Sequence, residues 1–158
     1  MKIGMIIYNF ILALWVGGIF IFTFLVTPII FQSFGRDTAG EIVGKLFPYY
    51  FPYNLIISIL ALTVFLLFIG IQGKIESKIT IILLTSAGLI NSFITFKLHP
   101  DIKTVKQQII TFETQSDESP MRNQFRKLHR MSAILNILLL IDGTTLLILN
   151  NTFKKYNF

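Results

Sequence analysis

Cysteine is absent from this chain of 158 residues, and charged residues are scarce. Without a thiol, the protein can form no disulfide, no thiolate metal site and no cysteine nucleophile. Charged residues make up 14% of the chain, whereas a soluble domain carries about 25%. Hydrophobic residues reach 53%, so the missing charge favours a lipid bilayer as the solvent for most of the chain.

Four apolar stretches are long enough to cross a membrane. A helix needs about 20 apolar residues to span the hydrocarbon core of a bilayer. Lipid cannot pair exposed backbone N–H and C=O groups, and four segments cannot close a barrel, so each stretch must be helical. The sequence therefore predicts one all-α domain over 1–158, an integral membrane four-helix bundle with spans at about 3–31, 52–71, 79–98 and 131–149.

The connections between these spans differ in length and character. Residues 72–78 form a tight turn, so the second and third spans are predicted to be antiparallel neighbours. In the third connection, Ile102, Val105 and Ile109 recur among Lys and Gln residues. This spacing over 102–112 predicts a short amphipathic helix on the membrane surface.

The basic residues lie unevenly on the two sides of the predicted bundle. Five Lys and Arg residues fall on the side of the termini, and nine fall on the side of the first and third loops. Positive residues favour the cytoplasm, so we expect a plasma-membrane protein with those two loops inside and both termini outside. The net charge of +6 then suits lipid head groups. Nucleic acid is not an expected partner, because no basic stripe with interleaved aromatics lies outside the spans.

Polar residues at membrane depth are costly and usually face the bundle interior. Asn91 lies eight residues before His99, and Asn136 lies seven residues after His129, so each pair returns to one helix face. With Ser132, these residues form a candidate polar face. The asparagines either bond between helices or line a cavity for a ligand, and both interpretations stay open.

An aromatic and proline-rich stretch follows the first span. It is predicted to be an interfacial cap, whose members are Lys45, Phe47, Pro48, Tyr50 and Phe51. The stretch shares its membrane side with His99 and His129. We therefore expect the cap to cover the end of the bundle where the polar face opens.

Asp142 is a candidate buried acid in the fourth span. A lone ionised carboxylate at this depth is expensive, so it is expected to be neutral or paired with Asn9, which lies at similar depth. Either a structural aspartate or a group for proton or cation passage fits the sequence. Trp15 is expected to be buried between helices, and Gly17-Gly18 to permit close helix approach.

The two histidines raise the question of a metal site. Imidazole binds haem iron, copper and zinc. The sequence offers no thiolate, no closely spaced histidine pair and no clear carboxylate partner. No metal site or cofactor is therefore predicted, and haem or copper held by His129 and His99 is kept as an alternative.

Several short motifs occur in a characteristic order. They are Trp15-Val16, Thr38, Gly40, Val43, Lys45-Leu46-Phe47-Pro48, Tyr50-Phe51, Asn91, Pro100, Phe125 and a His-x-x-Ser-x-x-x-Asn pattern over 129–136. In these residues the chain resembles the transmembrane-protein-205-like proteins, a family of small four-helix membrane proteins of unknown function. The resemblance implies a four-helix membrane bundle and no established reaction. Copper-resistance membrane proteins and a haem-pathway oxidase have a similar plan. His99 departs from the pattern, because relatives can carry an acidic residue just before the proline.

Three functions remain after these observations. The first is an accessory or stabilising subunit of a larger membrane complex, with other membrane subunits as partners and no catalytic activity of its own. The second is a transport or cavity protein for a small solute or metal ion. It predicts a continuous polar path through Asn9, Asp142, Asn136 and His129. The third is a haem- or metal-binding membrane protein.

Overall fold

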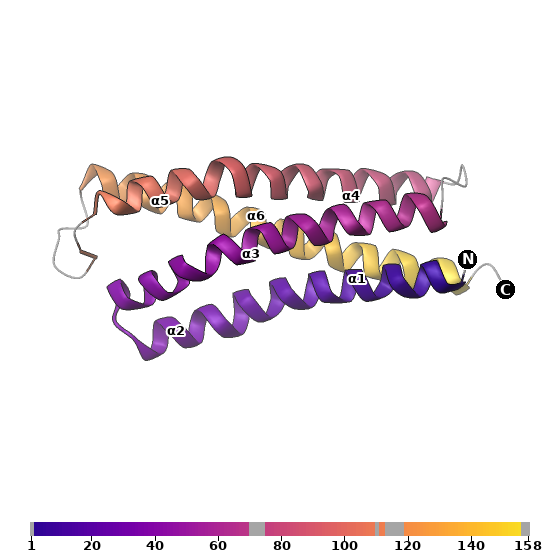
Figure 1. Cartoon of the computed structure of the whole chain (residues 1–158), viewed down its shortest axis with the longest axis horizontal. Helices are drawn as coiled ribbons and strands as arrows, with labels where there is room; N and C mark the ends of the chain where they lie inside the picture. Colours follow the sequence, from indigo (N-terminus) through magenta and orange to yellow (C-terminus); the bar gives the residue numbers. More distant parts are fainter. Residues whose placement is uncertain (1, 70–74, 110, 113–118, 156–158) are drawn as a thin grey trace.

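This computed structural model describes residues 2–69, 75–109, 111–112 and 119–155. Within those residues, four long helices are apolar enough to cross a membrane, and the prediction of an all-α membrane bundle is confirmed. The first long helix begins and the last one ends at the same end of the bundle (Figure 1). Four membrane spans require both ends of the chain to lie on the same side of the membrane, and the bundle meets this requirement.

The long helices are built from shorter elements. In chain order these are α1 (Lys2–Ile21), η1 (Phe22–Val26), α2 (Thr27–Ser33), α3 (Arg36–Val64), η2 (Phe65–Ile69), α4 (Ile75–Phe93), η3 (Ile94–Leu98), α5 (His99–Gln107) and α6 (Pro120–Lys155). The η elements are π-helical turns of five residues. A π-turn adds a residue to the helical repeat and is often found at functional sites. Here η1 joins α1 to α2, and η3 joins α4 to α5.

The expectation of a loop between the predicted spans at 3–31 and 52–71 is wrong, because α3 begins at Arg36 and continues through this stretch. Pro48 and Pro52 both lie inside the helix. Each removes one backbone hydrogen bond, which is the reason for expecting a break. Packing against neighbouring helices keeps the helix continuous, as it does for prolines in membrane helices generally.

The amphipathic segment of the third connection also differs from its prediction. It is helical as α5, but it continues directly from η3, and its apolar residues Ile102 and Val105 are buried. α5 packs against α6, so protein rather than lipid covers its apolar face. In the predicted turn at 72–78, residues 75–78 already belong to α4, and 72–74 lie outside the described residues.

The core runs along the centre of the bundle. α1 packs on α3 and α6, and α4 packs on the same two helices. Trp15 has no exposed surface, as predicted, and Leu12, Ile19 and Leu84 are equally buried. Many large apolar side chains face outward, where a bilayer would surround them.

Glycines set the closest helix contacts. A Cβ at Gly143 would lie 2.8 Å from Cγ2 of Val16, and a Cβ at Gly18 would lie 2.9 Å from the ring of Tyr53. The Tyr53 hydroxyl donates a 2.9 Å hydrogen bond to the Leu14 carbonyl. Gly17 has open space at its side, so only the second glycine of the predicted pair serves packing inside the bundle.

Candidate functional site

One asparagine links three of the long helices. The Tyr50 hydroxyl of α3 donates a 2.7 Å hydrogen bond to Oδ1 of Asn136 in α6. Nδ2 of Asn136 donates a 2.7 Å bond to Oγ1 of Thr23. Thr23 belongs to the π-turn η1, which joins α1 to α2. Both ends of the Asn136 amide are therefore used between helices.

Two further asparagines extend this arrangement toward the terminal end of the bundle. Nδ2 of Asn54 donates to the Tyr50 carbonyl, while its Oδ1 is buried without a hydrogen bond. Nδ2 of Asn91 in α4 is likewise buried without one. Asn54 lies 15 residues before Ile69, and Asn91 lies 16 residues after Ile75, on antiparallel neighbours. Each is about 23 Å along its helix from the connection between them, so both lie at the same depth.

Thr95, one turn from Asn91, belongs to the π-turn η3, and its Oγ1 is also buried without a hydrogen bond. We call the whole set the polar layer; its members are Thr23, Tyr50, Asn54, Asn91, Thr95 and Asn136. Asn136 lies five residues inside the apolar run that begins at Met131. Asn136 is therefore about 8 Å inside the apolar region, on the side of the first and third connections.

Aromatic rings surround the polar layer on that side. Phe22 stacks on Tyr50 with ring centres 4.0 Å apart, and Phe47 stacks on Phe51 at 5.0 Å. The expected proximity of the cap to Asn136 is present through Tyr50. Lys45 instead turns outward to pair with Glu41 at 2.7 Å, and Pro48 is exposed. A functional role for these residues stays a prediction.

The two histidines have separate aromatic neighbours. The His99 ring lies 5.2 Å from the ring of Phe51, whereas His129 stacks on Phe125 in its own helix at 5.7 Å. His129 is exposed, and Ser132 is buried at 7% exposure. Across the described part of the chain, no three His, Cys, Asp or Glu side chains come close enough to share a metal ion.

The alternative pairing of Asp142 with Asn9 is not formed. Oδ1 of Asn9 accepts a hydrogen bond from the amide of Asn150. Asn150 lies eight residues beyond Asp142, about 12 Å farther along α6. Both carboxylate oxygens of Asp142 are buried without a hydrogen bond.

Packed leucines separate the polar groups of α6. Leu139 lies between Asn136 and Asp142, and Leu146 lies between Asp142 and Asn150. Each leucine is only 1% exposed. Buried apolar side chains therefore lie between successive polar residues along the inner side of α6.

A lysine fixes α5 against α3. Nζ of Lys106 donates a 2.5 Å hydrogen bond to the Gly40 carbonyl. A Cβ at Gly44 would lie 3.3 Å from the same Nζ, and one at Gly40 would lie 3.5 Å from it. The glycine pair thus leaves room for the ammonium group beside the backbone.

Sequence reasoning missed Thr23, Thr95 and the donor role of Tyr50. A threonine inside an apolar run is a weak signal, because its hydroxyl usually bonds its own helix backbone. Nothing in the composition of 22–26 or 94–98 marks a π-turn. The polar partners therefore become visible only with the backbone geometry.

A family model described as "Domain of unknown function (DUF4149)" matches residues 10–111. This range contains every member of the polar layer except Asn136. Comparison with curated proteins and with solved structures finds no match. The family match covers more than half of the chain, and the chain belongs to this family.

Proposed function

We propose that this member of the DUF4149 family, an integral membrane protein, works by association as an accessory or stabilising subunit of a larger membrane complex. One observation carries the proposal. Asn136 and Asn150 tie helices together, and buried Leu139 and Leu146 lie between the polar groups of α6, which favours a packed scaffold over a conduit.

Two asparagines of α6 provide hydrogen bonds between helices. Asn136 joins α6 to η1 and α3, and Asn150 joins α6 to α1. Interhelical hydrogen bonds of this kind average about 0.6 kcal/mol each in membranes. They are suited to holding one arrangement of helices, which a binding partner could then recognise.

The outer surface supports association with other helices. Gly17 of α1 and Gly88 of α4 both have open space beside them. Small residues on an outer face let a second helix approach closely. Large apolar side chains dominate the rest of that surface, so lipid and membrane subunits are the partners it suits.

The chain contains no cysteine, so a single introduced cysteine can be cross-linked specifically to test for a partner. Single cysteines are placed at one exposed position on each long helix, namely Ile6, Leu67, Leu89 and Ile148. The protein is cross-linked in native membranes and isolated under mild conditions. The proposal expects a stoichiometric partner that cross-links from one or two of these faces and not from the others.

Two results would contradict the subunit role. One is a chain recovered alone in native mass spectrometry from several mild detergents. The other is uniform cross-linking from all four positions to many abundant proteins, which marks random collision. A cysteine at fully buried Leu84 is the matched control and should give no cross-link.

The polar layer favours a second candidate, a binding site for a small polar solute. Oδ1 of Asn54, Nδ2 of Asn91 and Oγ1 of Thr95 are an acceptor, a donor and a hydroxyl, all buried without hydrogen bonds. A buried polar group without a bond costs about 1–3 kcal/mol. A solute with both donors and acceptors would remove that cost. The adjacent π-turn η3 supports the same interpretation.

Cysteine accessibility separates this candidate from a sealed bundle. Asn91→Cys and Leu84→Cys lie two turns apart on the same buried face of α4. If small solutes reach the polar layer, a small hydrophilic methanethiosulfonate modifies Asn91→Cys and leaves Leu84→Cys unreacted. Equal protection of both cysteines would remove the candidate.

We keep haem or copper at His99 and His129 as an alternative proposal, and we also propose kinship with the transmembrane-protein-205-like proteins. The separate aromatic neighbours of the two histidines give a shared metal little support. A Soret band or stoichiometric copper in the purified protein would revive it. We also propose a plasma-membrane location with α5 and the start of α3 facing the cytoplasm, supported by the positive charge at that end.

A further inference from the structure

Each of the four long helices carries a buried polar group that makes no hydrogen bond. These groups are Nε1 of Trp15 in α1, Oδ1 of Asn54 in α3, Nδ2 of Asn91 in α4 and both carboxylate oxygens of Asp142 in α6. The helices pack in a ring, since α3 contacts α1 and α4, and α6 contacts the same two helices. The three neutral side chains are at most 1% exposed. All four groups therefore belong to the interior that the ring encloses.

The carboxylate of Asp142 is level with Trp15. A Cβ at Gly143, the residue after Asp142, would lie 3.5 Å from Cε3 of the Trp15 ring. The Tyr8 hydroxyl of α1 is also buried without a hydrogen bond, and it interacts electrostatically with Asp142. The carboxylate therefore points into the bundle and not toward lipid.

The two asparagines lie at nearly the same depth as Asp142. The ring of Tyr53, the residue before Asn54, packs on Gly18, and Gly18 is about 5 Å from Trp15 along α1. Asn91 of α4 is level with Asn54 on the neighbouring helix. The two amides and the carboxylate thus lie within about one helical turn of each other along the bundle axis.

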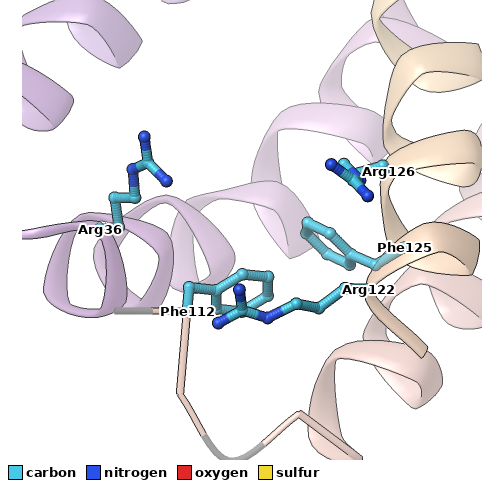
Figure 2. A pocket seen from close by; sticks show the side chains of 5 residues that line it. All are labelled: Arg36, Phe112, Arg122, Phe125 and Arg126. Carbon is cyan, nitrogen blue, oxygen red and sulfur yellow. The ribbon is translucent and has the colours of Figure 1, made fainter. Parts of the chain in front are cut away.

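Asp142 has no counter-charge among the described residues. It is the only acid in the four predicted spans, and it forms no ion pair in the described part of the bundle. Figure 2 shows arginines that extend from α3 and α6 at the loop end, and Arg126 precedes Asp142 by about 24 Å along α6. Asp142 itself is about 16 Å beyond Met131, near the middle of a hydrocarbon core of about 30 Å. An ionised carboxylate at this depth requires a positive partner.

Oxygen atoms suited to a cation lie around this carboxylate. Oδ1 of Asn54 is a carbonyl oxygen without a hydrogen bond, and Thr95, one turn beyond Asn91, has a buried hydroxyl without one. The Asn91 amide presents its oxygen when it turns about its last bond. Carboxylate and carbonyl oxygens are the ligands that hard cations prefer. Thr95 also belongs to the π-turn η3, and cation sites of other membrane proteins lie near the bilayer centre where a helix is irregular.

We propose that Asp142 binds a small monovalent cation together with Asn54, Asn91 and Thr95. One carboxylate is balanced by one positive charge, whereas a divalent ion would leave a net charge in the membrane interior. The carboxylate oxygens are buried, so a lysine of another subunit would have to displace a helix to reach them. A small ion avoids that rearrangement.

The ion would be held inside the bundle. Buried Leu139 and Leu146 lie on either side of Asp142 along α6, so the site is closed toward both ends. The site shares Asn54 and Asn91 with the solute site of the second candidate function. The proposal therefore rests on that candidate and gives its ligand a positive charge.

Thermal unfolding of the full chain in detergent micelles tests the proposal. The protein is kept in choline chloride, and choline is replaced stepwise by Na⁺, K⁺ or NH₄⁺ at constant ionic strength, so that screening does not change. A bound ion should raise the unfolding temperature along a saturating curve, by about 3–6 °C at ten times its Kd. A response to Na⁺ or K⁺ identifies a metal ion. A response to NH₄⁺ alone identifies an ammonium group that donates hydrogen bonds to the same oxygens.

Two variants remove parts of the site. Asp142→Asn keeps the shape of the side chain without its charge, so the ion-dependent rise should disappear. Asn54→Leu removes one oxygen ligand and should raise the Kd of the ion about tenfold. If Asp142→Asn does not fold, the Kd of Asn54→Leu decides the question.

Two further variants are matched controls. Glu41→Gln removes an exposed acid from α3 and should keep the full ion-dependent rise. Asn136→Leu removes a buried amide that already has two partners. It should lower the unfolding temperature equally in every salt and leave the rise intact.

Several results would overturn the cation site. One is the same unfolding temperature in all four salts, and another is a rise that survives Asp142→Asn or is lost in Glu41→Gln. If Asn91→Cys reacts with the methanethiosulfonate while no ion stabilises the protein, the solute site stands and the cation is wrong. Cross-linking to a partner uses the outer surface, so its outcome is independent of this test.

Discussion

The Tyr50 hydroxyl and the Asn136 amide meet across the bundle, 86 positions apart in the chain, in a 2.7 Å hydrogen bond. The Asn136 amide also donates a hydrogen bond to the Thr23 hydroxyl. The three residues come from α3, α6 and η1, so a single amide side chain fixes the relative depth of three long helices. This arrangement permits a direct energetic test.

Removing the Tyr50 hydroxyl should lower the stability of the protein by a small but measurable amount. We expect Tyr50→Phe to lower the free energy of unfolding by about 1 kcal/mol, and Asn136→Leu by about 1–2 kcal/mol, because interhelical bonds in membranes are individually weak. Unfolding in mixed micelles by SDS titration measures both values. In a double-mutant cycle the two changes should not add, since they remove the same bond.

Tyr49→Phe is the natural control, because Tyr49 is the neighbouring tyrosine and is 78% exposed. Its unfolding free energy should match that of the wild-type protein. Full additivity of Tyr50→Phe with Asn136→Leu would mean that the hydrogen bond contributes nothing to stability.

The close contact at Gly143 predicts a steric effect. Gly143→Ala places a methyl group 2.8 Å from Cγ2 of Val16, closer than carbon atoms normally approach. Overpacking of this kind typically costs about 1–3 kcal/mol. Gly17→Ala and Gly88→Ala add the same methyl group to open space and should be neutral or slightly stabilising. A comparison of the three unfolding midpoints checks the expectation.

The presence of four long apolar helices was predictable, because long apolar runs with few charges have one physical explanation. The start of α3 was not. Pro48, Pro52 and the charged turn at Arg36 are the usual signals of a loop, and they act locally. Hydrogen bonds between residues distant in sequence override these local signals. Lys106 donates one to the Gly40 carbonyl, and the backbone N–H of Phe112 donates one to Asp37.

The candidate site was predictable only in part. Counting along each helix placed Asn136 and the aromatic stretch at one end of the bundle, and Tyr50 does reach Asn136. The same counting gave a neutral Asp142 or its pairing with Asn9 as alternatives. The pairing is not formed, because depth alone does not fix the rotation or the exact level of a helix. The Asn150 amide donates a hydrogen bond to Asn9 instead. No pattern of residues in the sequence indicated the π-turns.

The bond from Lys106 to Gly40 predicts a local effect on α5. Lys106→Met keeps a long apolar stem but removes the donor, so the contact of α5 with α3 should loosen. Hydrogen exchange of α5 amides should then accelerate about fivefold to tenfold, corresponding to a lost hydrogen bond of about 1 kcal/mol. Lys103→Met changes an exposed lysine on the same helix and should leave the exchange unaltered. Equal exchange in both variants would show that the lysine bond does not hold α5.

Asp142 is the most costly side chain in the spanning part of α6. Both carboxylate oxygens are buried, and neither makes a hydrogen bond. An aspartate near the centre of a membrane helix costs about 3 kcal/mol on insertion scales. If the carboxylate serves only this bundle, Asp142→Leu should raise the free energy of unfolding by about 1–3 kcal/mol. SDS titration measures the change, with exposed Thr144→Leu as the control on the same turn.

A loss of stability would instead show that the carboxylate has a partner in the folded protein. A gain in stability together with loss of the co-isolated membrane partner would assign Asp142 to the association itself.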